Sequence, residues 1–244
     1  MMKHTYFGIA LLAGLLAPAA ATGQKLPFAP GEELTFSVRS SRLGGDGTAV
    51  MKVTADTARG RDVYLMAFDF NAKVLLFKAS DRTRSWFDPA TRSSLRYAKR
   101  ERSPLGSYDE AVEIFGEEGY WRSKDGKFDC ASPDPLDELS FLYFIRTLPL
   151  EDGATYGLSR HFDQARNPVR VRVVGRKVLP DTRHEGSYRT VLVEMRVPDS
   201  RQETGTSLLR VYLTDDEQRV PVRIESAMPI GGTMVMTLDS RMVR

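Results

Sequence analysis

Residues 133–150 read PDPLDELSFLYFIRTLPL and limit the possible folds more strongly than any other segment. On a helix, successive residues are about 100° apart, and here apolar side chains surround the whole axis. They are Leu136, Leu139, Phe141, Leu142, Tyr143, Phe144, Ile145 and Leu148. A helix that is apolar on every side is either buried or inserted in a membrane, and about 14 residues are too few to cross one. The rest of the chain must therefore enclose this helix.

Both ends of the segment carry helix-boundary signals. Asp134 precedes Pro135, which is typical of an N-cap followed by proline at the first helical position. Arg146 lies in the last turn, where positive charge favours the helix dipole, and Pro149 ends the helix. We predict a helix over about residues 134–148.

Most of the remaining chain alternates apolar and polar residues with the period of a strand. The alternation is clearest from 169 to 225, where valines share one face and arginines, including Arg170 and Arg172, take the other. Residues 62–70 and 72–77 are predicted as two further strands, apolar on both faces, that need cover on both sides. We predict a mainly β fold with about a dozen strands. It is a strongly curved antiparallel sheet or open β-barrel that wraps one central apolar helix.

The N-terminus has the three-part layout of a secretory signal peptide. Lys3 precedes the apolar stretch 8–16, and three alanines at 19–21 offer a cleavage site. We predict a signal peptide over residues 1–21 and one β-rich domain over 22–244. The apolar stretch is too short to span a membrane, and no cysteine follows it to carry a lipid. We therefore expect a periplasmic protein that is not a lipoprotein and has no transmembrane segment in the mature chain.

Three stretches resemble the domain-of-unknown-function 3108 family of exported bacterial β-proteins. They are APGEELTFSV with a glycine-rich turn and TAVMKV, then DPLDELSFLYFIRTLPLEDGATY, and finally RVPVRIES followed by GGTMVMTL. They occur in the family's order and span most of the mature chain. The resemblance implies a fold like that of the periplasmic lipoprotein carriers, an open β-barrel around a helix. It implies no activity and supplies no catalytic residues.

The histidines and the cysteine do not form a recognisable metal or thiol site. His161 and Asp163, with His184 and Glu185, could supply ligands, but their spacing matches no known zinc pattern and arginines border both segments. We interpret His161 and Asp163 as an exposed loop pair and expect no metal and no cofactor. Cys130 is the single cysteine, so no internal disulfide can form. We expect it to be a small buried apolar residue.

Nothing in the sequence marks an enzyme. Adjacent acids such as Asp109–Glu110 and Asp215–Asp216 could supply the paired carboxylates of a glycosidase, but they are expected in turns. No serine lies in a nucleophile elbow. The formal net charge of +3 does not indicate nucleic acid as a partner for an exported protein. We therefore expect no enzymatic activity.

The best candidate for a ligand pocket is an aromatic and aliphatic set around the helix. Its members are Tyr64, Met66, Phe68, Leu75, Phe77, Phe141 and Phe144. If the helix stands off from the sheet, these side chains could line a cavity for a lipid or acyl chain. If it packs tightly, they form a closed core. Our leading hypothesis is the first alternative.

Basic residues suggest a second hypothesis. The segment 82–102 carries Arg82, Arg84, Trp86, Arg92, Arg96, Tyr97, Lys99, Arg100 and Arg102. They could meet an anionic partner, above all if the fold brings Arg170, Arg172 and Arg176 close to them. The simpler alternative is a solvated strand face. In this second hypothesis the chain is an interaction module of the cell envelope, and its partner is another envelope protein.

Overall fold

The structure is a computed structural model. It describes residues 25–41, 46–74, 77–104, 106–181, 185–199, 205–227 and 232–243. The predicted signal peptide lies outside the described residues, and so do Leu75 and His184.

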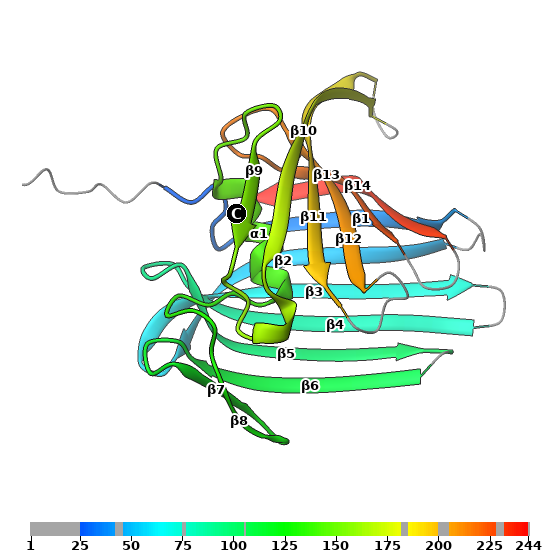
Figure 1. Cartoon of the computed structure of the whole chain (residues 1–244). Coiled ribbons are helices and arrows are strands. Elements are labelled where there is room, and N and C mark those ends of the chain that lie inside the picture. The colour runs from blue at the N-terminus through cyan, green and yellow to red at the C-terminus, as the bar shows by residue number, and fades with distance from the viewer. Residues whose placement is uncertain are drawn as a thin grey trace, which may run out of the picture.

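All the described strands belong to one antiparallel sheet of fourteen strands (Figure 1). Eight precede the helix: β1 (Glu32–Ser40), β2 (Asp46–Ala58), β3 (Arg61–Val74), β4 (Phe77–Asp88), β5 (Ser93–Ser103), β6 (Gly106–Phe115), β7 (Tyr120–Ser123) and β8 (Gly126–Asp129). Six follow it: β9 (Thr155–Leu158), β10 (Val169–Pro180), β11 (Ser187–Pro198), β12 (Thr206–Thr214), β13 (Pro221–Ala227) and β14 (Thr233–Val243). Each strand pairs with the strands next to it in sequence, except that β8 and β9 do not pair with each other, and β1 pairs with β14. The order across the sheet therefore runs from β8 through β1 and β14 to β9.

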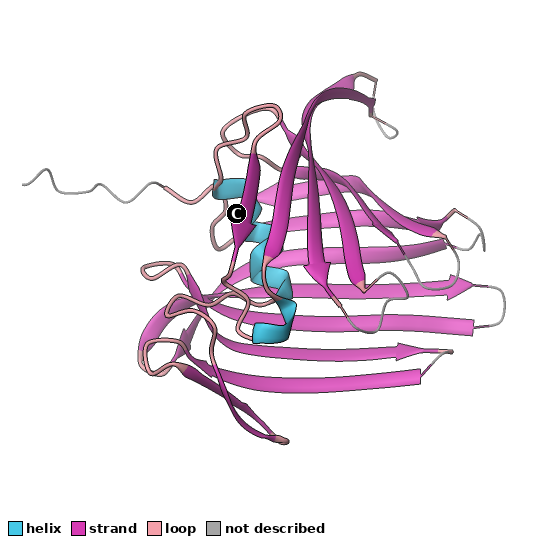
Figure 2. Ribbon diagram, in the orientation of Figure 1, coloured by secondary structure: helices cyan, strands magenta, loops and turns pink. Residues whose placement is uncertain are grey.

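The sheet is strongly curved, as the ribbons of Figure 2 show. Isolated bridges join Cys130 to Asp163 and Leu136 to His161, linking the segment after β8 to the segment after β9. One buried cluster combines side chains from β1–β4, from β10–β14 and from the helix. The strands β8 and β9 stay at the two edges, so the sheet is not closed. A mainly β, open antiparallel architecture with one short α-helix is thus confirmed.

The helix is shorter than predicted. The described helical segments are α1 (Glu138–Phe144), the 3-10 helix η1 (Ile145–Thr147) that follows it directly, and a second 3-10 helix, η2 (Gln164–Arg166). The predicted start at Asp134 is wrong, because Leu136 still forms a β-bridge and Asp137 is the N-cap. No helix in the described part of the chain is long and apolar enough to cross a membrane.

One predicted strand is also wrong. The pattern from 72 to 77 predicts a separate strand, but β3 continues without a break to Val74 and β4 begins at Phe77. The sequence KVLLFK contains no glycine, proline or asparagine to mark a turn. A run of four apolar residues, 74–77, therefore crosses the point where the chain reverses.

Asp137 fixes the start of α1 and joins it to the sheet. The side chain is fully buried, and one carboxylate oxygen accepts hydrogen bonds from the backbone N–H groups of Leu139 and Ser140, each at 2.9 Å. Ser85 of β4 donates to the other oxygen at 2.5 Å. Burial raises the pKa of Asp137 above its ordinary value, although these donors act in the opposite direction.

We expect Asp137→Ala to lower the free energy of unfolding by about 1–2 kcal/mol, because the cap and the Ser85 contact are both lost. Urea unfolding followed by tryptophan fluorescence measures the change. Asp163→Ala is the matched control: Asp163 caps η2 through the N–H of Ala165, at a more exposed position. We expect it to cost less than about 0.5 kcal/mol. Equal losses in both variants would contradict a special role of Asp137.

Candidate functional site

The inner face of the sheet, the face that contributes to the core with α1, is only partly buried. On β3, Met66 is completely buried, whereas Phe68 and Phe70 on the same face are half-buried. The same change occurs toward the N-terminal ends of β12 and β14. There Val211 and Met236 are buried. Leu209 and Met234, two positions earlier on the same face, are half-buried.

We call the half-buried set the apolar wall. Its members are Phe68, Phe70, Leu209 and Met234. Because the strands are antiparallel, the C-terminal end of β3 and the N-terminal ends of β12 and β14 lie toward the same end of the sheet. The apolar inner face therefore continues beyond the buried core.

The structure brings most of the predicted pocket residues together. Five of the seven belong to one hydrophobic cluster: Tyr64, Met66, Phe68, Phe141 and Phe144. Met66 and Phe141 are at most 1% exposed and pack as core, while the other three are half-buried. Leu75 lies outside the described residues, and of Phe77 only the backbone in β4 is described. Whether these residues contact a ligand stays a prediction.

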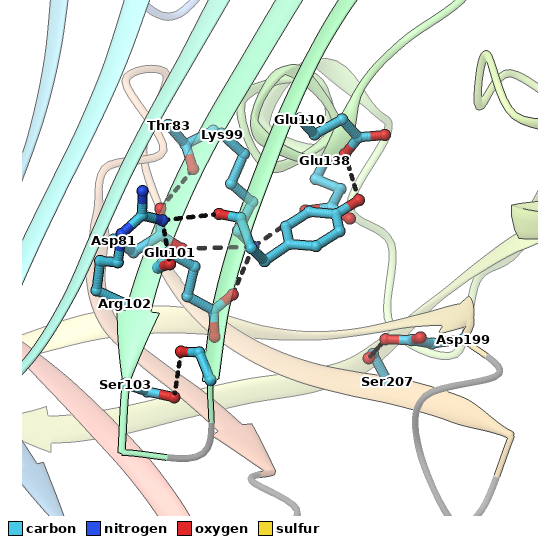
Figure 3. A network of polar contacts seen from close by, with 12 residues as sticks. Asp81, Thr83, Lys99, Glu101, Arg102, Ser103, Glu110, Glu138, Asp199 and Ser207 are labelled. Atoms are coloured by element: carbon cyan, nitrogen blue, oxygen red, sulfur yellow. Dashed lines mark hydrogen bonds and ion pairs between the residues drawn. The ribbon is translucent and has the colours of Figure 1, made fainter. Parts of the chain in front are cut away.

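Beside the apolar wall, the same face turns polar on β4–β6. We call Asp81, Lys99, Glu101 and Glu138 the polar wall; Figure 3 shows their side chains gathered beside the strands. The Lys99 ammonium, whose side chain is 15% exposed, lies 3.4 Å from Asp81, 3.7 Å from Glu101 and 3.5 Å from Glu138. Glu138 is the first residue of α1, so the ion pairs of Lys99 link the helix to β4 and β5.

The two walls are in register. Across β3 and β4, Phe68 is directly opposite Thr83, and Phe70 is directly opposite Asp81. Across β4 and β5, Thr83 is opposite Lys99. An apolar row thus passes into a charged row within two strands, about 10 Å. The inner face is amphipathic at this end of the sheet.

A separate cavity of about 1010 Å³ lies at the C-terminal end of η1. Its charged lining residues are Lys25, Glu32, Arg92, Arg146, Glu151, Arg176, Asp215, Asp216, Glu217, Arg219 and Arg241. Both signs are present in nearly equal number, and several are paired with each other, as in the ion pair of Arg176 with Asp215 at 3.5 Å. None of the seven predicted pocket residues lines it. Its charge selects neither anions nor cations.

Arg146 forms a buried ion pair that the sequence did not reveal. Its guanidinium donates to the two carboxylate oxygens of Glu32 at 2.7 and 2.9 Å, and both side chains are at most 3% exposed. It also donates to the carbonyl oxygens of Pro27 and Gln218, at 2.8 and 3.0 Å. One side chain therefore joins η1 to the N-terminal segment, to β1 and to the β12–β13 loop.

His161 is not the exposed loop residue that the sequence predicts. It is 1% exposed, and its ring lies 4.7 Å from that of Phe162 and 6.3 Å from that of Phe141, centroid to centroid. Its Nδ1 accepts a hydrogen bond from the N–H of Asp163 at 3.1 Å. Burial lowers the pKa of His161 to about 4. Within the described ranges, no group of three or more His, Cys, Asp and Glu side chains is arranged to hold a metal ion.

Cys130 is half-buried rather than fully buried as expected. Its thiol lies 3.3 Å from the carbonyl oxygen of Ser132, and it packs beside Trp121 against a small second cluster around Tyr97 and Phe162. Burial raises the pKa of the Cys130 thiol, which disfavours the reactive thiolate.

The basic segment 82–102 does not form one cluster with Arg170 and Arg172. On the outer face of β4 and β5, the face opposite α1, most of its arginines are paired with carboxylates. The pairs are Arg84 with Asp69, Arg96 with Glu113, and Arg102 with Asp109. Strands β1–β3 and β11–β14 separate β4 from β10 in the sheet. Lys99 lies on the inner face instead.

Comparisons with known proteins give one family profile and two solved structures. The sequence profile described as protein of unknown function (DUF3108) matches residues 35–239. A β-barrel-like protein of the domain of unknown function DUF1849 from Brucella abortus superposes with a TM-score of 0.60. It is 10% identical, and the match covers 87% of this chain and 97% of that one. A DUF1089 family protein from Pseudomonas aeruginosa gives a TM-score of 0.30 at 13% identity, covering 88% and 95% of the two chains. No curated protein matches. The chain belongs to the DUF3108 family.

Proposed function

We propose that this chain is a non-enzymatic protein of the cell envelope, exported to the periplasm, that binds a lipid or another hydrophobic ligand between the sheet and α1. In this proposal its fold resembles that of the periplasmic lipoprotein carriers, with the sheet wrapped around the helix. The observation that carries the proposal is the apolar wall. Large apolar side chains there continue the inner face beyond the core without being buried themselves.

Phe70 and Leu209 are half-buried. Covering them with an acyl chain would remove their apolar surface from water and so stabilise the complex. The neighbouring polar wall offers hydrogen-bonding groups to the other end of such a molecule. A ligand with an apolar tail and a polar head fits this pairing better than a purely apolar one. The tail would contact Phe68 and Phe144, and the head would lie toward Lys99 and Glu101.

Native mass spectrometry of protein purified from its own envelope tests for a bound lipid. A fluorescent fatty acid then serves as a probe for purified, lipid-stripped protein. We expect Leu209→Ser to weaken probe binding roughly fivefold, because part of a leucine side chain no longer contacts the tail.

Leu208→Ser is the matched control, since the adjacent residue belongs to the opposite face of β12 and is similarly half-buried. We expect it to leave probe affinity unchanged. Equal effects of the two substitutions, or an absence of both co-purifying lipid and probe binding, would refute the proposal.

A further inference from the structure

The outer face of β10–β13 carries a ladder of arginines, which we call the arginine face. Its members are Arg170, Arg172, Arg196, Arg210 and Arg223. They alternate along the strands with core residues such as Val171, Val211 and Ile224, so their side chains point away from α1. Arg170 is directly opposite Arg196 on the neighbouring strand, and Arg172 is directly opposite Glu194.

The arginine face is strongly positive. Five arginines stand against two glutamates, Glu194 and Glu225, which leaves an excess of three positive charges. The glutamate side chains are each 14% exposed, whereas those of Arg196, Arg210 and Arg223 are 51%, 41% and 38% exposed. The arginines therefore cover the carboxylates and present their own charge to the solvent.

Two of these arginines lack a carboxylate partner. Among the described residues, no Asp or Glu forms an ion pair with Arg170 or Arg172, and Arg196 reaches Glu194 only at 3.7 Å. Like charges directly opposite each other destabilise a sheet, so the Arg170–Arg196 pair costs free energy in the isolated protein. An external anion would relieve this repulsion.

We infer that the arginine face docks the protein onto an anionic lipid surface. Arginine binds phosphate groups bidentately. These arginines are spread over four strands, about 4.8 Å apart from one strand to the next and about 7 Å apart between alternate residues of a strand. None of them lines the cavity at the end of η1 or a second one between the β1–β2 and β3–β4 ends of the sheet. A face that spreads its guanidinium groups in this way matches an array of phosphates.

Apolar side chains flank the arginine face and favour a bilayer over an acidic protein. Val174 of β10 is 37% exposed, and the half-buried Leu208 of β12 lies directly opposite Arg196. Positive charge beside exposed apolar side chains is typical of surfaces that bind anionic membranes. Docking through this face would place the bilayer and the apolar wall on opposite sides of β12, so the inference does not depend on the proposed ligand.

Sedimentation with vesicles of phosphatidylglycerol and phosphatidylcholine tests the inference, with pure phosphatidylcholine vesicles for comparison. We expect binding to the anionic vesicles alone, weakening as salt is added. Each basic residue near such a surface strengthens binding roughly fivefold. We therefore expect Arg170→Gln with Arg196→Gln to weaken binding about 25-fold.

The control is Arg82→Gln with Arg100→Gln, a second pair of arginines directly opposite each other, on the outer face of β4 and β5. It removes the same charge from another part of the sheet, and we expect less than a threefold change. Circular dichroism checks that both double variants are folded. Equal weakening in the two double variants, or no binding of the wild type to anionic vesicles, would overturn the inference. So would binding to an acidic envelope protein without any binding to vesicles.

Discussion

Arg146→Met should destabilise the protein by about 3–5 kcal/mol, the largest single effect that we expect. The substitution removes the close partner of the buried Glu32 carboxylate, which keeps only Arg241 at 4.0 Å, and it also removes the donors to Pro27 and Gln218. A buried charge without a counter-charge is far more costly than a lost surface ion pair. Urea unfolding at neutral pH measures the change.

Replacing both members of the pair, Glu32→Leu with Arg146→Met, separates the two possible origins of this loss. If the cost comes from the uncompensated carboxylate, the double variant should recover most of the lost stability, because apolar replacements of buried pairs are often neutral. An equally unstable double variant would instead show that the bonds to the two carbonyl oxygens dominate. Lys52→Met, which breaks the exposed ion pair with Glu33, is a surface control with an expected effect below about 1 kcal/mol.

Acid should weaken the fold through His161, by about 3 kcal/mol between pH 6.5 and pH 4. The folded-state pKa of His161 is lowered to about 4 from an ordinary value of 6.5. Between these pH values His161 is protonated in the unfolded chain but not in the folded protein. The free energy of unfolding therefore falls as the pH falls. Above pH 6.5 the ring is neutral in both states and its contribution is constant.

The measurement is a comparison of urea unfolding for the wild type and His161→Gln at several pH values. Asp137 acts in the opposite direction, because its raised pKa lets the folded state bind a proton first as the pH falls. Its effect is common to both proteins and cancels in the difference. The difference should shrink by about 3 kcal/mol from pH 6.5 to pH 4. A difference that does not depend on pH would contradict the buried, neutral state of His161.

The strands were most predictable where one face of the sheet is exposed to solvent and the other is buried. Val169, Val171 and Val173 alternate with arginines, and all three valines are completely buried. The β3–β4 reversal was not predictable, since KVLLFK has no turn residue. The helix start was misplaced because Asp134–Pro135 looks like a cap, although the β-bridge at Leu136 keeps that segment extended. A tertiary contact overrides the local signal there.

Of the apolar wall, only the part on β3 could be predicted from the sequence. Alternation in β3 places Phe68 on the inner face, but its companions Leu209 and Met234 come from strands far along the chain. Their proximity depends on the sheet order, which no local pattern contains. Lys99 carries a usable signal: it alternates with Arg96, Ala98 and Arg100 and must therefore face the other way.

The pairing of β1 with β14 also sets the order of events during folding. Residue 32 is paired with residue 243, so the earliest strand made keeps one unpaired edge until nearly the whole chain is present. Contacts between such distant residues form slowly, and an open strand edge is a template for aggregation. A nascent chain of this kind would benefit from a chaperone that covers β1 until synthesis ends. A truncation that removes β14 would leave that edge exposed permanently.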